Sequence, residues 1–255
     1  MSHTLSEQAL KEQFESIGGV WTEAWAVLLE LDPGYFASYL KLRAVPAKNQ
    51  NLPTKIQELL LIALDAACTT LFVPGIKAHI EAALKAGASR AEILDVLQLS
   101  SVLGIHAITM GVPTLLQVLE EEGKQQPIPM DARREALKAD YEAKRGFWDP
   151  IWQAVVDMDP DFFEAYTEFS SHAFRKPGGG SLDPMVKELL FCAIDVSTTP
   201  LYAPGLKVHV RNAIRYGATP AQILEVYQLA ALMGVHTPLV AAEFLGTAVT
   251  NGDKS

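Results

Sequence analysis

Residues 75–88 read GIKAHIEAALKAGA, and residues 205–218 read GLKVHVRNAIRYGA. The two stretches begin 130 positions apart, since 205 minus 75 is 130. Under that shift, 23 of the 55 positions from 52 to 106 are identical. Self-similarity at a fixed period is the signature of a repeated structural unit. The sequence therefore predicts two tandem copies of one unit.

The repeat extends outward from this stretch in both directions. Trp21 and Asp32 match Trp148 and Asp159 under a shift of 127, and a Gly-rich insertion at 176–181 accounts for the difference of three. A polar segment with two prolines separates the copies. We expect a first repeat at 1–122, a linker at 123–131 and a second repeat at 132–255, with the two halves packed against each other.

Helix start and stop signals recur along both copies. Asp32 precedes Pro33 as an N-cap followed by proline at the first helical position. Ser89 and Glu92 form the pattern of a capping box, and Gly87 suits a helix end. No segment alternates between apolar and polar residues as a strand would. The predicted fold class is all-α, built from two tandem helical bundles.

Composition limits the functional classes. The 255 residues carry a formal net charge of -9 and 49% hydrophobic residues. This acidity argues against nucleic acid or an anionic membrane surface as a partner. The uncharged stretch 96–119 contains polar residues and two glycines, so we interpret it as buried core rather than a membrane span. Cys68 and Cys192 form neither a disulfide nor a zinc pattern, which favours a cytoplasmic protein.

Two residue types in each copy could carry acid–base chemistry. Glu58 shares a largely apolar helical face with Asp65, and Glu188 repeats it. A carboxylate in such a place is paired or has a raised pKa. His79 and His209 recur in the same sequence context, and a histidine near a buried carboxylate forms an acid–base pair. The alternative is that all four are satisfied structural residues.

His106 and His236 each stand in Gly-x-His at the end of a long apolar stretch. We expect them near the pocket of their own copy, where they could position a substrate. Two histidines with Glu58 could also hold a metal, but no short ligand spacing supports that interpretation. The alternative is a buried histidine bonded to a helix carbonyl.

The order of these motifs resembles the carboxymuconolactone decarboxylase-like superfamily, which includes alkylhydroperoxidase D-like proteins. The resemblance covers about 52–119 and 182–245. It implies an all-helical fold that oligomerises, here as a trimer of tandem chains. The peroxidase branch uses a Cys-x-x-Cys pair between the glutamate and the histidine. This chain has Cys68 alone in the first copy and Thr198 in the second. The decarboxylase branch lacks the pair and keeps the histidine.

The resemblance implies a cofactor-independent lyase or isomerase that acts on a small organic acid or lactone, as in aromatic catabolism. The predicted catalytic residues are Glu58, His79, Glu188 and His209. The predicted substrate-binding residues are His106, His236, Phe72, Tyr202, Lys77 and Lys207, with no metal and no cofactor. Two alternatives stay open: a thiol peroxidase that uses Cys68, and a non-catalytic oligomer that binds a ligand.

Overall fold

The computed structural model describes residues 6–124, 128–174 and 181–252, and these residues form helices and turns without a strand. The first repeat contains α1 (Glu7–Ser16), α2 (Glu23–Leu31), α3 (Pro33–Asn49), α4 (Thr54–Ala66), α5 (Val73–Lys85), α6 (Arg90–Ser101), the 3₁₀ turn η1 (Val102–Ile105) and α7 (His106–Glu121). The second contains α8 (Ala132–Arg145), α9 (Ile151–Met158), α10 (Pro160–Ser171), η2 (His172–Phe174), α11 (Pro184–Val196), α12 (Ala203–Arg215), α13 (Pro220–Ala231), η3 (Leu232–Val235) and α14 (His236–Gly252). The predicted all-α fold is confirmed.

The sequence signals for helix ends operate as expected. The Asp32 carboxylate accepts the Tyr35 backbone N–H at 2.8 Å and caps α3. Ser89 and Glu92 complete a reciprocal capping box at the start of α6. Gly87 closes α5 with a φ of 89°, a conformation that glycine adopts without strain. The Gly-rich insertion at 176–181 lies, apart from Ser181, outside the described residues.

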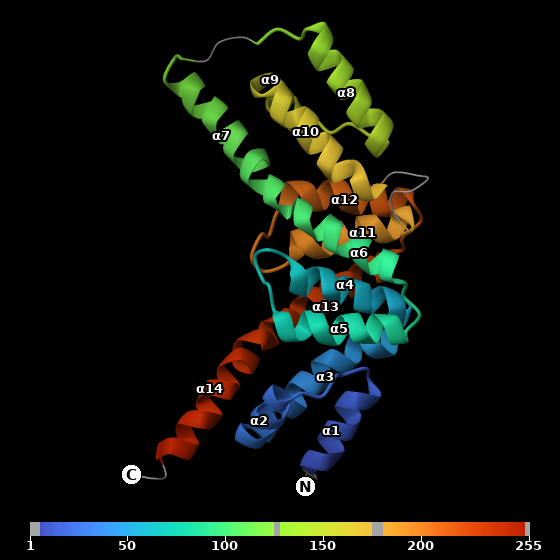
Figure 1. The fold of residues 1–255 in the computed structure, drawn as a ribbon, viewed down its shortest axis with the longest axis vertical. Helices are drawn as coiled ribbons and strands as arrows, with labels where there is room; N and C mark the ends of the chain where they lie inside the picture. Colours follow the sequence, from blue (N-terminus) through green and yellow to red (C-terminus); the bar gives the residue numbers. More distant parts are fainter. Residues whose placement is uncertain (1–5, 125–127, 175–180, 253–255) are drawn as a thin grey trace.

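The centre of the molecule is shared between the two repeats. Figure 1 shows helices of the two repeats stacked together at the centre, and α4 contacts both α11 and α13. One continuous apolar core contains residues of both copies, with Leu60 and Leu190 fully buried. Burying such a side chain contributes about 1.5–3 kcal/mol. The expected packing of the two halves against each other is confirmed.

Each end of the molecule is a flanking group of three helices held by aromatic packing. In α1–α3, the ring of Phe14 lies 4.7 Å from that of Trp25. The equivalent rings in α8–α10, Tyr141 and Trp152, lie 5.4 Å apart. Aromatic pairs in such tilted arrangements contribute about 0.5–1.5 kcal/mol beyond the area they bury. These clusters hold the flanking helices together beside the central layers.

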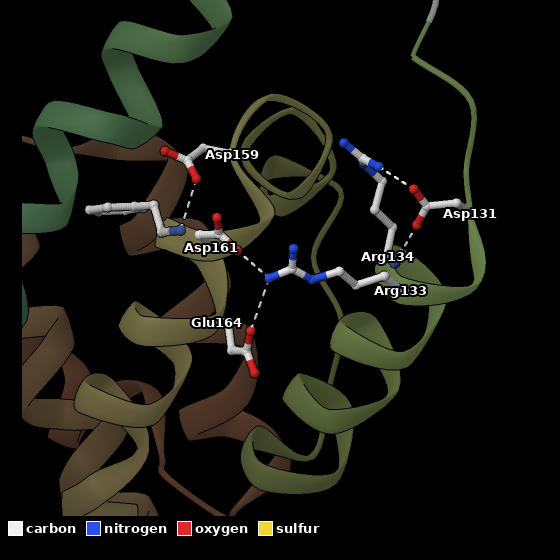
Figure 2. A network of polar contacts seen from close by, with 7 residues as sticks. Asp131, Arg133, Arg134, Asp159, Asp161 and Glu164 are labelled. Atoms are coloured by element: carbon white, nitrogen blue, oxygen red, sulfur yellow. Dashed lines mark hydrogen bonds and ion pairs between the residues drawn. The ribbon is translucent and has the colours of Figure 1, made fainter.

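A polar network also connects α8 to α10 at the surface (Figure 2). Arg133 of α8 contacts Asp161 and Glu164 of α10, and Asp131 caps α8 and contacts Arg134. Ion pairs at such exposed positions add little to stability because water screens them. The apolar cluster around Tyr141 therefore holds these helices more than the network does.

The last helix of each repeat crosses to the other repeat. η1 turns the chain so that α7 packs on α9, and η3 turns it so that α14 packs on α2 (Figure 1). The two repeats therefore exchange their last helices. This exchange decides where His106 and His236, the first residues of these helices, are placed.

The apolar stretch 96–119 is only partly core. Its α6 portion is buried at Val96 and Leu99, but Thr109 is the one buried residue of α7. The prediction of a buried helix is therefore wrong for α7. Two helical stretches, Arg90–Glu121 and Pro220–Ala242, are long and apolar enough to meet the length and composition of a membrane span. Both are interrupted by a 3₁₀ turn.

Candidate functional site

Two equivalent clusters of histidines and carboxylates form the candidate sites. The first site comprises Glu58, Asp65, His79 and His236, and the second comprises Glu188, Asp195, His209 and His106. Helix α4 presents Glu58 and Asp65 on one face because they lie two turns apart. The neighbouring helix α5 places His79 against both.

A short hydrogen bond joins the predicted histidine and glutamate in each site. His79 Nδ1 lies 2.7 Å from Glu58 Oε2, and His209 Nδ1 lies 2.7 Å from Glu188 Oε2. A carboxylate accepts the Nδ1–H, which fixes the tautomer and the ring orientation and leaves Nε2 on the opposite side. His79 Nε2 lies 3.8 Å from Asp65 Oδ2. The glutamates therefore orient the histidines.

The second histidine of each site comes from the other repeat. His236 Nε2 lies 3.4 Å from Asp65 Oδ1, and His106 Nε2 lies 3.1 Å from Asp195 Oδ1. Our expectation that His106 and His236 serve the pocket of their own copy is wrong, because α7 and α14 cross over. Each site is complete only when both repeats are present.

Asp65 and Asp195 belong to the sites, although no role was predicted for them. Asp65 is 1% exposed. Its Oδ2 has no hydrogen-bond partner among the described residues, and Asp195 Oδ2 has none there either. A side chain at Gly75 or Gly205 would overlap these oxygens, so both glycines are needed for the close approach of α5 and α12. The sequence does mark these aspartates, because the spacing from glutamate to aspartate is the same in both copies.

Burial changes the protonation of the first site. It raises the pKa of the Asp65 carboxyl to about 7; His79 opposes this shift, and the Glu58 carboxylate adds to it. Burial, together with the neighbouring His79, lowers the pKa of His236 to about 4. Their 3.4 Å contact therefore joins a neutral imidazole to a carboxyl group that exchanges its proton near pH 7.

A strained loop places an aromatic ring against the crossing histidine. Leu71 has a φ of 45° and Leu201 a φ of 41°, which is unusual for residues other than glycine. The next residue, Phe72, stacks on His236 with ring centroids 3.9 Å apart. Tyr202 lies against His106 at 4.1 Å. Phe72 and Tyr202 line the cavities, as predicted from the sequence.

A cavity opens beside each cluster. The first has a volume of about 360 Å³ and is bordered by Asp65, His79 and His236, and the second, of about 70 Å³, by Asp195, His209 and His106. Glu58 and Glu188 contact the Nδ1 side of the histidines and do not line these two cavities. Glu58 borders a further cavity of about 260 Å³ instead. This placement supports a positioning role for them rather than the predicted direct one.

Lys77 and Lys207 do not lie in the sites. Both are exposed, and neither lines a cavity described above. Residues two apart on a helix point in nearly opposite directions, so the lysines point away from His79 and His209. Their predicted substrate-binding role has no support in this geometry. They are kept in both copies without a structural explanation.

Each cavity contains an arginine, but the two arginines come from helices that are not equivalent in the two repeats. Arg43 of α3 donates to the Gly18 carbonyl at 3.1 Å, and Arg145 of α8 donates to the Ser170 carbonyl at 3.2 Å. Under the shift of 127, Gly18 corresponds to Arg145 and Arg43 to Ser170. The position that holds the arginine in one repeat therefore holds the carbonyl acceptor in the other repeat. The two arginines stand at different positions of the repeat, so an alignment of the two copies does not pair them.

The two cysteines are free and lie outside the cavity linings. Cys68 is exposed, whereas Cys192 is buried, and burial raises the pKa of its thiol. Among the described residues, no three of His, Cys, Asp and Glu are arranged to hold a metal ion. The groups that lie together at the two sites are therefore imidazoles and carboxyl groups, and not thiols.

Replacing Cys68 with serine is expected to leave turnover at the two sites unchanged, because the thiol borders neither cavity. The expected rate of cumene hydroperoxide reduction is at background for the wild type as well, since no second thiol is available to resolve a sulfenic acid. A coupled peroxide-reduction assay of both proteins measures this. Peroxide reduction that disappears in C68S would restore the peroxidase hypothesis.

Both repeats match a known protein family, and the whole chain matches a solved structure. The pattern of the carboxymuconolactone decarboxylase family matches residues 33–120 and 160–243, one match in each repeat. The chain belongs to the carboxymuconolactone decarboxylase family. A crystal structure from Burkholderia xenovorans LB400, of a provisionally assigned gamma-carboxymuconolactone decarboxylase subunit, is similar over its full length. The two sequences are 42% identical, the TM-score is 0.93, and the alignment covers 98% of this chain and 99% of that one. No curated protein matches the chain.

Proposed function

We propose that this member of the carboxymuconolactone decarboxylase family is a cofactor-independent decarboxylase or isomerase of a small organic acid or lactone. The observation that carries the proposal is the histidine oriented by a buried glutamate, with Nε2 facing a second buried carboxyl group beside a cavity. Such a pair can accept a proton and return one at a different atom. The non-catalytic alternative has less support because these groups border open space.

The reaction needs little more than these groups. In decarboxylation, the bond between the substrate's carboxylate and its ring carbon breaks, and carbon dioxide leaves. The electron pair passes into a conjugated carbonyl of the substrate and gives an enolate. His79 or Asp65 then delivers a proton to the electron-rich carbon, and Glu58 holds the imidazole in place. In isomerisation, the same groups remove a proton from one carbon and return it to another.

The direct test is turnover of carboxymuconolactone, together with other carboxylated lactones and β-keto acids, by purified protein. Release of carbon dioxide and the NMR spectrum of the product distinguish decarboxylation from isomerisation. We expect turnover of at least one carboxylated lactone, with retention of activity after treatment with a chelator. Absence of both reactions across the panel would favour the ligand-binding alternative.

The pH dependence tests the role of Asp65. Its acid form predominates below its pKa of about 7, so donation by Asp65 is lost as the pH rises through that value. We expect kcat/KM to be level on the acid side and to fall about tenfold per pH unit above pH 7. Asp65→Asn should remove this limb, and the matched variant Asp195→Asn should retain it. An unchanged profile in D65N would exclude Asp65 as the acid.

We also propose that the chain is a homo-oligomer, as a trimer of tandem chains. The support is the apolar surface that α7 and α14 leave uncovered, including Met110 and Leu115 on one helix and Val240 and Leu245 on the other. Large apolar side chains exposed on two helices suit a subunit interface, which would cover them. Light scattering after size-exclusion chromatography measures the mass, and a monomeric mass would contradict the proposal.

A further inference from the structure

The two sites share their reactive groups but differ in size. The cavity of the first site measures about 360 Å³ and that of the second about 70 Å³. A cavity of about 150 Å³ is enough to hold benzene in another protein. The first cavity therefore has room for a ring with substituents, whereas the second has room for a few water molecules.

The difference follows from substitutions between the repeats. Phe147 and Ile151 border the second cavity where Val20 and Ala24 border the first. Phe191 stands in place of Leu61 and stacks on His209 with ring centroids 4.5 Å apart. Each change adds volume at an equivalent position. The second cavity is thus filled by its own side chains.

Both cavities contain an arginine, Arg43 in the first and Arg145 in the second, but the balance of charge around it differs. In the first, Arg43 is about nine-tenths buried, and its Nε has no hydrogen-bond acceptor among the described residues. An arginine so placed is a strong receptor for a carboxylate. In the second, Asp149 borders the cavity where the first has Thr22. That extra carboxyl group disfavours an anionic ligand.

We propose that the sites have diverged, so that the first binds a ring-sized organic anion at Arg43 while the second is closed to it by Phe147, Ile151 and Phe191. The proposal rests on the proposed function for the location of the substrate but concerns binding alone. One chain therefore binds one such ligand, and the side chains that line the first cavity determine specificity. The second site accepts only smaller molecules.

Calorimetric titration with benzoate tests the stoichiometry, with benzamide as the neutral probe of the same shape. We expect one benzoate per chain and weaker binding of benzamide. Arg43→Met should lower benzoate affinity about ten- to a hundredfold and leave benzamide affinity unchanged. Equal losses for both probes would show that Arg43 only supports the fold, and would overturn its role. Two equivalent benzoate sites, or none, would overturn the inference.

Exchanging side chains between the repeats gives matched variants. Val20→Phe with Ala24→Ile should abolish benzoate binding at the first site. The reciprocal variant, with Phe147→Val, Ile151→Ala and Phe191→Leu, should raise the stoichiometry to two if Asp149 is also replaced by Thr. Circular dichroism establishes that each variant is folded, and an unaltered stoichiometry in both folded variants would contradict the inference. One-site binding without turnover of any lactone would remove only the proposed function.

Discussion

Replacing His79 with asparagine is expected to lower kcat for decarboxylation by about 10²–10⁴-fold, the usual contribution of general acid–base catalysis. Asparagine can still donate a hydrogen bond to Glu58, which accepts from His79 at 2.7 Å, but it cannot exchange a proton. The remaining rate comes from the other groups of the first site, which still bind and orient the substrate. Single-turnover and steady-state measurements of carbon dioxide release, with carboxymuconolactone as substrate, determine the loss.

The matched control is His209→Asn in the smaller second site. If the first site carries most of the turnover, H209N should retain kcat within about twofold, because its cavity of about 70 Å³ excludes the substrate. Glu58→Gln should lower kcat less than H79N, since it loosens the orientation of the imidazole without removing it. Full activity in folded H79N would show that the histidine is structural.

The helices and their pairing into two repeats could be predicted because the information is local. Asp32, Gly87 and the Ser89 capping box specify helix ends through hydrogen bonds within a few residues. The crossing of α7 and α14 could not be predicted in this way. An apolar face shows that a helix must pack, but not whether its partner lies in its own repeat or in the other.

The same limit explains the errors at the site. Glu58 and His79 were predicted together because helical spacing and repetition both marked them, and they form a hydrogen bond. His106 was assigned to the wrong site because its position depends on η1 and on the helix exchange. Lys77 recurs as Lys207 in the second copy, but repetition alone does not show whether a side chain points into the cavity. Arg43 went unrecognised because its counterpart occupies a different position in the second repeat.

Replacing Glu225 with alanine is expected to destabilise the whole chain by about 2–6 kcal/mol. Glu225 is 0% exposed and accepts hydrogen bonds from the backbone N–H groups of Asn51 at 2.9 Å and Leu52 at 3.1 Å. It also accepts from the Gln57 amide at 2.8 Å. Each buried backbone donor left without an acceptor costs about 1–3 kcal/mol. Urea unfolding followed by circular dichroism measures the change in the free energy of unfolding.

The position of Glu225 gives this variant a consequence beyond stability. The residue belongs to α13 of the second repeat, whereas Asn51 and Leu52 precede α4, which carries Glu58 and Asp65 of the first. Asp95 is the equivalent residue and contacts Ser181 before α11, through fewer donors among the residues that the structure describes. Asp95→Ala should therefore destabilise less than E225A. A loss below about 1 kcal/mol in E225A would mean that water replaces the carboxylate, and that the first site does not depend on this tie between the repeats.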